Sequence, residues 1–92
     1  MNDSKYVVVS NKPMNKGGIE KLVVFDASLN HIDMAKAMGR LGYSFIISAG
    51  FIDEFMNCFG SSMTCRCSTR GDIDTIMLHE MLNIDDKELK FK

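Results

Sequence analysis

Two β-branched runs separated by a flexible turn constrain the fold of this chain more than any other feature. Residues 5–10 are KYVVVS and residues 20–25 are EKLVVF, and β-branched side chains favour strands. Pro13 and the pair Gly17 and Gly18 lie between the two runs, and these residue types are typical of turns. The sequence therefore predicts a β-hairpin over residues 5–25.

A helix is predicted to follow this hairpin. Asn30 is placed to cap it, Asp33 comes three residues later, and Leu29 can pack on Met34 as a hydrophobic staple. Gly42 is placed to end the helix, because glycine adopts the left-handed conformation without strain.

Residues 43–52, YSFIISAGFI, alternate with the period of a strand, and residues 57–68 show a similar alternation. We expect these two segments to form a second, longer hairpin that turns around residues 53–56. Residues 69–72, TRGD, then open a final helix. Its apolar residues at helical spacing are Ile73, Ile76, Met77, Met81 and Ile84.

The order β-β-α-β-β-α predicts an α+β fold: a single domain over residues 1–92, with a four-stranded antiparallel sheet and both helices on one face. We expect residues 1–4 and 85–92 to fray. A chain of 92 residues buries a modest share of its surface, so association into a homo-oligomer would add stability. The predicted core consists of Val7, Val9, Val24, Met34, Met38, Phe45, Ile47, Ile73, Ile76 and Met77.

Charge and hydropathy exclude several classes of function. The net charge is −1, with acidic and basic residues interspersed, so the basic surface that direct nucleic-acid binding needs is not predicted. No apolar run reaches the roughly 18 residues of a membrane span, and the first residues do not resemble a secretory signal. Three cysteines without an export signal indicate free thiols in the cytoplasm.

The three cysteines fit packing better than metal binding or redox chemistry. Cys58, Cys65 and Cys67 are spaced by seven and then two positions, unlike the paired spacing of structural zinc sites. Free cysteine behaves as a small buried hydrophobe. We therefore expect unpaired, metal-free thiols and no cofactor.

A catalytic function is not predicted. His31 and Asp33 could exchange a proton, but no nucleophile or oxyanion donor is recognisable near them. Their position in the first turn of the predicted helix is explained by capping alone. The sequence thus favours a protein that is not an enzyme.

The polar face of the second predicted hairpin is the candidate binding surface. Strand parity sets small hydroxyls and a guanidinium opposite the predicted core, and a glycine there permits close approach of a ligand or another backbone. A helix N-terminus follows, where unpaired amides and an arginine attract anions, unless Thr69 and Asp72 serve only as its cap. The predicted binding residues are Ser48, Gly50, Ser62, Thr64, Arg66, Thr69 and Arg70.

Four short motifs resemble those of small uncharacterised proteins encoded by phages and prophages. They are Asn30-His31-x-Asp33-x-Ala35, Ser48-Ala49-Gly50-Phe51, Gly60-x-Ser62-x-Thr64 and Thr69-Arg70-x-Asp72. The likeness spans most of residues 5–80. The last motif is usually Ser-Arg before a proline, and aliphatic residues usually stand where this chain has Cys65 and Cys67.

This resemblance implies a viral or prophage origin rather than a mechanism. The leading hypothesis is a non-enzymatic binding protein that blocks a host protein or complex in the host cytoplasm, for example a defence system such as CRISPR interference. The alternative is an oligomeric protein that sequesters a nucleotide or another small anion with Arg66 and Arg70. An enclosed cavity between subunits would favour the second hypothesis, and an exposed patch the first.

Overall fold

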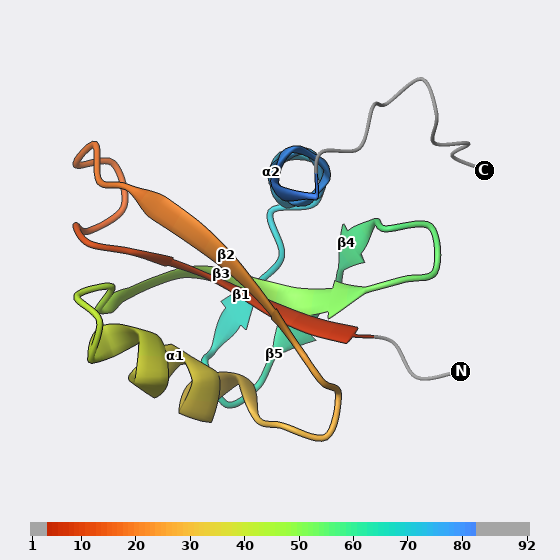
Figure 1. Cartoon of the computed structure of the whole chain (residues 1–92), viewed down its shortest axis with the longest axis horizontal. Helices are drawn as coiled ribbons and strands as arrows, with labels where there is room; N and C mark the ends of the chain where they lie inside the picture. Colours follow the sequence, from red (N-terminus) through yellow and green to blue (C-terminus); the bar gives the residue numbers. More distant parts are fainter. Residues whose placement is uncertain (1–3, 83–92) are drawn as a thin grey trace.

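The computed structural model describes residues 4–82, and Figure 1 shows a sheet with one helix on either side of it. The predicted α+β class, a small single compact domain, is confirmed. The elements in chain order are β1 (Ser4–Ser10), β2 (Glu20–Phe25), α1 (His31–Gly39), β3 (Phe45–Ile52), β4 (Cys58–Phe59), β5 (Ser61–Ser62), β6 (Cys67–Ser68) and α2 (Asp72–Met81).

Predictions for the chain ends fall largely outside the described residues. These are the fraying of residues 1–3 and 85–92 and the helical position of Ile84. Ser4 is described as the first residue of β1, where it pairs with Ile52. No helix among residues 4–82 is long and apolar enough to cross a membrane.

The main sheet is antiparallel, with strand order β2-β1-β3-β4. The predicted first hairpin is confirmed, since β1 and β2 pair from Lys5↔Phe25 to Ser10↔Glu20. The predicted start and end of α1 are correct in position: Asn30 is its N-cap residue, and Gly42 follows the helix with a φ of 98°. The Asn30 side chain makes no capping hydrogen bond within the described residues.

The second hairpin differs from its prediction. Only Cys58 and Phe59 continue the sheet as β4, and the chain then leaves the sheet at Gly60, whose φ is 81°. Residues 61–68 form a separate small hairpin of β5 and β6. A left-handed residue interrupts a ladder, which explains why the alternation of residues 57–68 does not yield one long strand.

The two helices lie on opposite faces of the sheet, so their predicted placement on one face is wrong (Figure 1). The central strand shows why. Tyr6 and Val8 pack in the cluster with Leu78 of α2, whereas Val7 and Val9 pack in the cluster with Ala35 of α1. A strand that is apolar at every position can be covered on both faces, and these four residues have no exposed surface.

A β-bulge in β3 changes the parity that the sequence suggests. Val8 pairs with Ser48 and Val9 pairs with Ile46, so Ile47 is the extra residue. Ile47 packs in the α2-side cluster and Ser48 lies opposite Val8, on the same face. Two consecutive residues of β3 therefore point toward α2.

The predicted core is correct in part. Val7, Val9 and Ile47 are buried, and Met34, Met38 and Met77 are half-buried against the two clusters. Four residues predicted in the core are 40–57% exposed instead, namely Val24, Phe45, Ile73 and Ile76. The errors in α2 have a single cause, which is the burial of Asp74.

Candidate functional site

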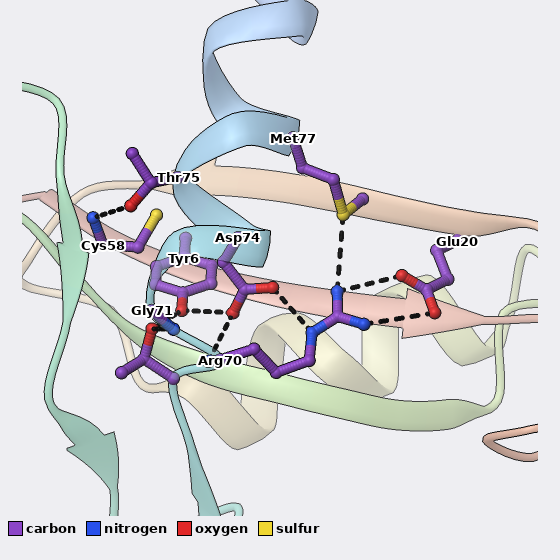
Figure 2. A network of polar contacts seen from close by, with 9 residues as sticks. Tyr6, Glu20, Cys58, Arg70, Gly71, Asp74, Thr75 and Met77 are labelled. Carbon is purple, nitrogen blue, oxygen red and sulfur yellow. Dashed lines mark hydrogen bonds and ion pairs between the residues drawn. The ribbon is translucent and has the colours of Figure 1, made fainter.

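A buried carboxylate attaches α2 to the sheet. Asp74 has no exposed surface, and its Oδ2 accepts a 2.6 Å hydrogen bond from the hydroxyl of Tyr6 on β1. The backbone N–H of Arg70 donates to the same oxygen at 3.0 Å. Figure 2 shows these groups converging beneath the first turn of the helix. The polar side of α2 at this point therefore faces the sheet.

Arg70 continues this network to the edge of the sheet. Its Nε donates to Asp74 Oδ1 at 2.8 Å, and its Nη2 and Nη1 donate to the carboxylate of Glu20 at 2.9 and 3.3 Å. Nη2 also lies 3.4 Å from the sulfur of Met77 (Figure 2). The guanidinium is thus held between one carboxylate from α2 and one from β2, which fixes its plane.

The ionisation of Asp74 depends on these partners. Burial favours its neutral form, but hydrogen bonds from Tyr6 and from Arg70 outweigh burial and hold the pKa of Asp74 below its ordinary value. Burial in turn raises the pKa of Tyr6, and the neighbouring Asp74 adds to the rise. Tyr6 therefore stays a neutral donor to a charged carboxylate.

Thr69 and Ser48 complete the surroundings of this carboxylate. Thr69 Oγ1 lies 2.5 Å from the Tyr6 hydroxyl and accepts from the Gly71 N–H at 3.0 Å. The Ser48 hydroxyl lies near this carboxylate, yet it makes no hydrogen bond with any residue between 4 and 82. Ser48 has no exposed surface. It faces the core under α2, and its predicted outward orientation is wrong.

Gly50 was predicted to permit the close approach of either a ligand or another backbone, and the structure shows a backbone there. A Cβ at this position would overlap with the carbonyl oxygen of Phe59 and lie 3.1 Å from the ring of Tyr6. The close approach is therefore that of the neighbouring strand's backbone.

The remaining predicted binding residues lie elsewhere. Ser62 is buried, and its hydroxyl accepts from the Cys65 N–H at 3.2 Å and lies 3.2 Å from Thr64 Oγ1. Arg66 is exposed in the turn between β5 and β6, with a φ of 54°. The seven residues do not share one surface: Ser48, Thr69 and Arg70 meet at the start of α2, while Ser62, Thr64 and Arg66 belong to the small hairpin.

The cysteines pack against the core, as predicted. Cys58 is buried in the α2-side cluster, and Cys65 and Cys67 lie against the α1-side cluster. All three are free thiols. Burial raises the pKa of the Cys58 thiol to about 11, so it is protonated at neutral pH. Within residues 4–82 no group of His, Cys, Asp and Glu is arranged to hold a metal ion.

His31 is more deeply placed than a capping role requires. It is buried, its Nε2 lies 2.8 Å from the carbonyl oxygen of Gly50, and its ring makes edge contacts with Phe25 and Phe51. Asp33 is exposed on the outside of α1. His31 therefore fastens α1 to β3.

A cavity of about 400 Å³ adjoins the Arg70 network. It lies between the β1–β2 loop, the sheet and the start of α2, and Glu20, Arg70 and Ile73 are among its lining residues.

Sequence reasoning missed Tyr6, Glu20 and Asp74 as members of this site. Only Asp74 could have been recognised from the sequence, because it stands four residues after Arg70, the spacing of a helical ion pair.

Comparison of the chain with protein-family models, with curated proteins and with solved structures finds no match.

Proposed function

We propose that this protein acts by binding another protein without catalysing a reaction, and that the outer side of α2 contributes to the contact. The observation that carries the proposal is the exposure of two isoleucines on that helix. Ile73 and Ile76 are 57% and 52% exposed. They stand three positions apart, so they lie side by side on one face, and exposed apolar surface of this kind is typical of interaction sites.

The burial of Asp74 explains why this apolar face points outward. The carboxylate takes the sheet-facing position of the helix together with Leu78, which is 1% exposed. If α2 were rotated to bury Ile73 and Ile76, Asp74 would lose its bonds to Tyr6 and Arg70. The apolar face is thus held outward by a specific polar anchor.

The polar network itself favours structure over chemistry. Tyr6 and Asp74 have no exposed surface, so a substrate would have to displace α2 to reach them. His31 is enclosed by two aromatic rings and bonded to a backbone carbonyl. These observations support a binding protein over an enzyme.

Sequestration of an anion has less support than protein binding. Two carboxylates already occupy the donors of Arg70, and Arg66 lies on the separate β5–β6 hairpin rather than at the cavity. The guanidinium therefore has little remaining capacity for an incoming phosphate or carboxylate.

The resemblance to phage and prophage proteins supports a host protein as the partner, and a host defence complex such as CRISPR interference as one candidate. Free thiols support the host cytoplasm as the place of contact. These two statements rest on the sequence motifs and the cysteines, while the proposed contact surface rests on α2.

The test begins with capture of a partner from a host lysate, followed by calorimetric titration of that purified partner. The double variant Ile73→Ser, Ile76→Ser should weaken binding at least about tenfold, which is about 1.4 kcal/mol. Its unfolding free energy should stay within about 0.5 kcal/mol of the parent, as for most surface changes.

Leu41→Ser is the matched control, because Leu41 is 71% exposed and follows α1. It should leave the affinity unchanged. Equal affinity of the parent and the double variant would show that α2 is not the contact surface.

A further inference from the structure

The cavity beside Arg70 has a polar and an apolar side. Ser10, Glu20 and Arg70 line it from the sheet and the start of α2, and Met14, Ile47 and Ile73 supply apolar surface. Its volume of about 400 Å³ lies in the range of small-molecule sites. A ligand here would meet a charged group at one end and aliphatic side chains along its length.

Glu20 and Arg70 at the polar side belong to a network whose charges sum to a negative value once the buried Asp74 is included. One guanidinium faces two carboxylates, those of Glu20 and Asp74. Asp74 is enclosed and fully bonded to Tyr6 and Arg70. Glu20 is different: its side chain is 33% exposed and each of its oxygens accepts one bond from Arg70. A carboxylate oxygen has two lone pairs, so Glu20 keeps acceptor capacity toward the cavity.

We propose that this cavity binds a primary ammonium group carried on an aliphatic chain. The ammonium donates to Glu20, and the chain lies against Ile47 and Ile73. Asp74, Arg70 and Glu20 form a row of negative, positive and negative charge. A bound ammonium would add a positive charge beside Glu20, so that the net charge of the four groups becomes zero. A long aliphatic ammonium suits a site that is apolar along its walls and polar at one end.

An anion fits the same cavity poorly. It would have to displace Glu20 from Arg70 and would then lie near the buried charge of Asp74. Lys12 and Lys16 belong to the loop at the cavity, but neither lines it, and both are exposed. The preference for a cation therefore follows from the remaining acceptor capacity of Glu20 and from the buried negative charge of Asp74 behind Arg70.

The proposal does not rest on the protein-binding function above, although Ile73 borders both the cavity and the exposed face of α2. The ammonium group could belong to a free aliphatic amine or to a lysine side chain of a protein partner, and both present the same chemistry to Glu20.

The experiment titrates the full chain with n-butylammonium chloride and follows methyl resonances by NMR at constant ionic strength. The expected result is a saturable shift of the Ile47, Ile73 and Met14 methyls, with a dissociation constant on the order of millimolar, the range that a probe this small can reach. n-Butanol and sodium acetate should each bind at least about tenfold more weakly. Equal effects of butanol, or a saturable shift by acetate, would overturn the proposal.

Glu20→Gln tests the anchoring carboxylate, with Glu54→Gln as the control. Both variants remove one negative charge from an exposed glutamate, but Glu54 does not line the cavity. Glu20→Gln should weaken butylammonium binding at least about tenfold and Glu54→Gln less than about twofold. Similar effects of the two changes would mean that only the net charge matters, which contradicts the site.

A last titration distinguishes the two sources of the ammonium group. Nα-acetyl-lysine methylamide carries the side chain as it occurs within a protein. Binding at least as tight as that of butylammonium assigns the cavity to a partner's lysine, and binding of butylammonium alone assigns it to a free amine. If neither compound shifts these resonances, the cavity is not an ammonium site.

Discussion

The Tyr6 hydroxyl donates a 2.6 Å hydrogen bond to Oδ2 of Asp74, which connects the first strand to the last helix across 68 positions of sequence. Both side chains are fully buried. A buried charge is strongly unfavourable unless hydrogen bonds satisfy it, and here Tyr6 and Arg70 do so. Together with the bonds from Arg70, this bond holds the Asp74 side of α2 against the sheet.

Asp74→Asn should destabilise the fold by about 2–4 kcal/mol. The amide cannot accept at both positions, so at least one of the donors from Tyr6 and Arg70 is left buried without a partner. Urea unfolding at pH 7 measures the loss. Asp72→Asn is the control at an exposed position of the same turn and should cost less than about 1 kcal/mol. Equal losses would show that Asp74 is not the anchor.

Alkaline pH should destabilise the protein through Cys58 and Tyr6. Burial raises the pKa of Cys58 to about 11, so the folded state holds the thiol proton more tightly than the unfolded chain. The resulting stabilisation is complete below the ordinary thiol pKa and is lost as pH rises toward 11. It amounts to about 2–3 kcal/mol. The raised pKa of Tyr6 extends the loss above pH 10 for the same reason.

Urea unfolding at pH 7, 9, 10 and 11 under reducing conditions checks this pH dependence. Cys58→Ala should be less stable at pH 7 but should lose less stability between pH 9 and 10. If the unfolding free energy of Cys58→Ala falls with pH as steeply as that of the parent, groups other than Cys58 cause the loss of stability at alkaline pH.

Ser48→Ala should leave the free energy of unfolding unchanged or raise it by up to about 1 kcal/mol. The Ser48 hydroxyl is buried without an ordinary hydrogen bond to a described residue, and removing such a group relieves its desolvation penalty. Ser62→Ala is the comparison, because the buried Ser62 hydroxyl accepts from Cys65, and it should cost about 1 kcal/mol. A loss above 1 kcal/mol for Ser48→Ala would show that the hydroxyl does bond to Asp74.

Gly50→Ala and Gly39→Ala should change stability in opposite directions. A Cβ at Gly50 overlaps with the Phe59 carbonyl, and relieving that overlap should cost about 2–3 kcal/mol. A Cβ at Gly39 meets open space at the end of α1, and alanine there should add about 0.5–1 kcal/mol. Thermal unfolding of the two variants measures both changes. A stable Gly50→Ala protein would mean that β4 does not pack as described.

The first half of the fold could be predicted because its signals are local. Strand preference, a turn with paired glycines, and the positions of Asn30 and Gly42 identify β1, β2 and α1 from neighbouring residues alone. The face of the sheet that each helix covers is not a local property. A run such as residues 7–9, VVV, is apolar on both sides, so it leaves open which face is covered.

In the second half of the fold, two features change which residues face the core, and the hydrophobic pattern of the sequence shows neither of them. The bulge at Ile47 turns one position of β3 to the other face, and the bonds of Asp74 rotate α2 away from its apolar stripe. Both depend on residues of β1. Thr69 and Arg70, two of the predicted binding residues, belong to the polar network at the start of α2. Its other members lie too far away in sequence for spacing to indicate them.

The separation of Tyr6 from Asp74 also affects how the chain acquires its structure during synthesis. Residues 4–52 contain the three long strands and α1, so most of the α1 face forms from the first part of the chain, and Cys65 and Cys67 join it later. The opposite face keeps Tyr6, Val8 and Ile47 uncovered until Leu78 has left the ribosome, because these residues share one cluster. A chain truncated before residue 74 should therefore present an apolar face and an unbonded tyrosine, the kind of surface on which chaperones act.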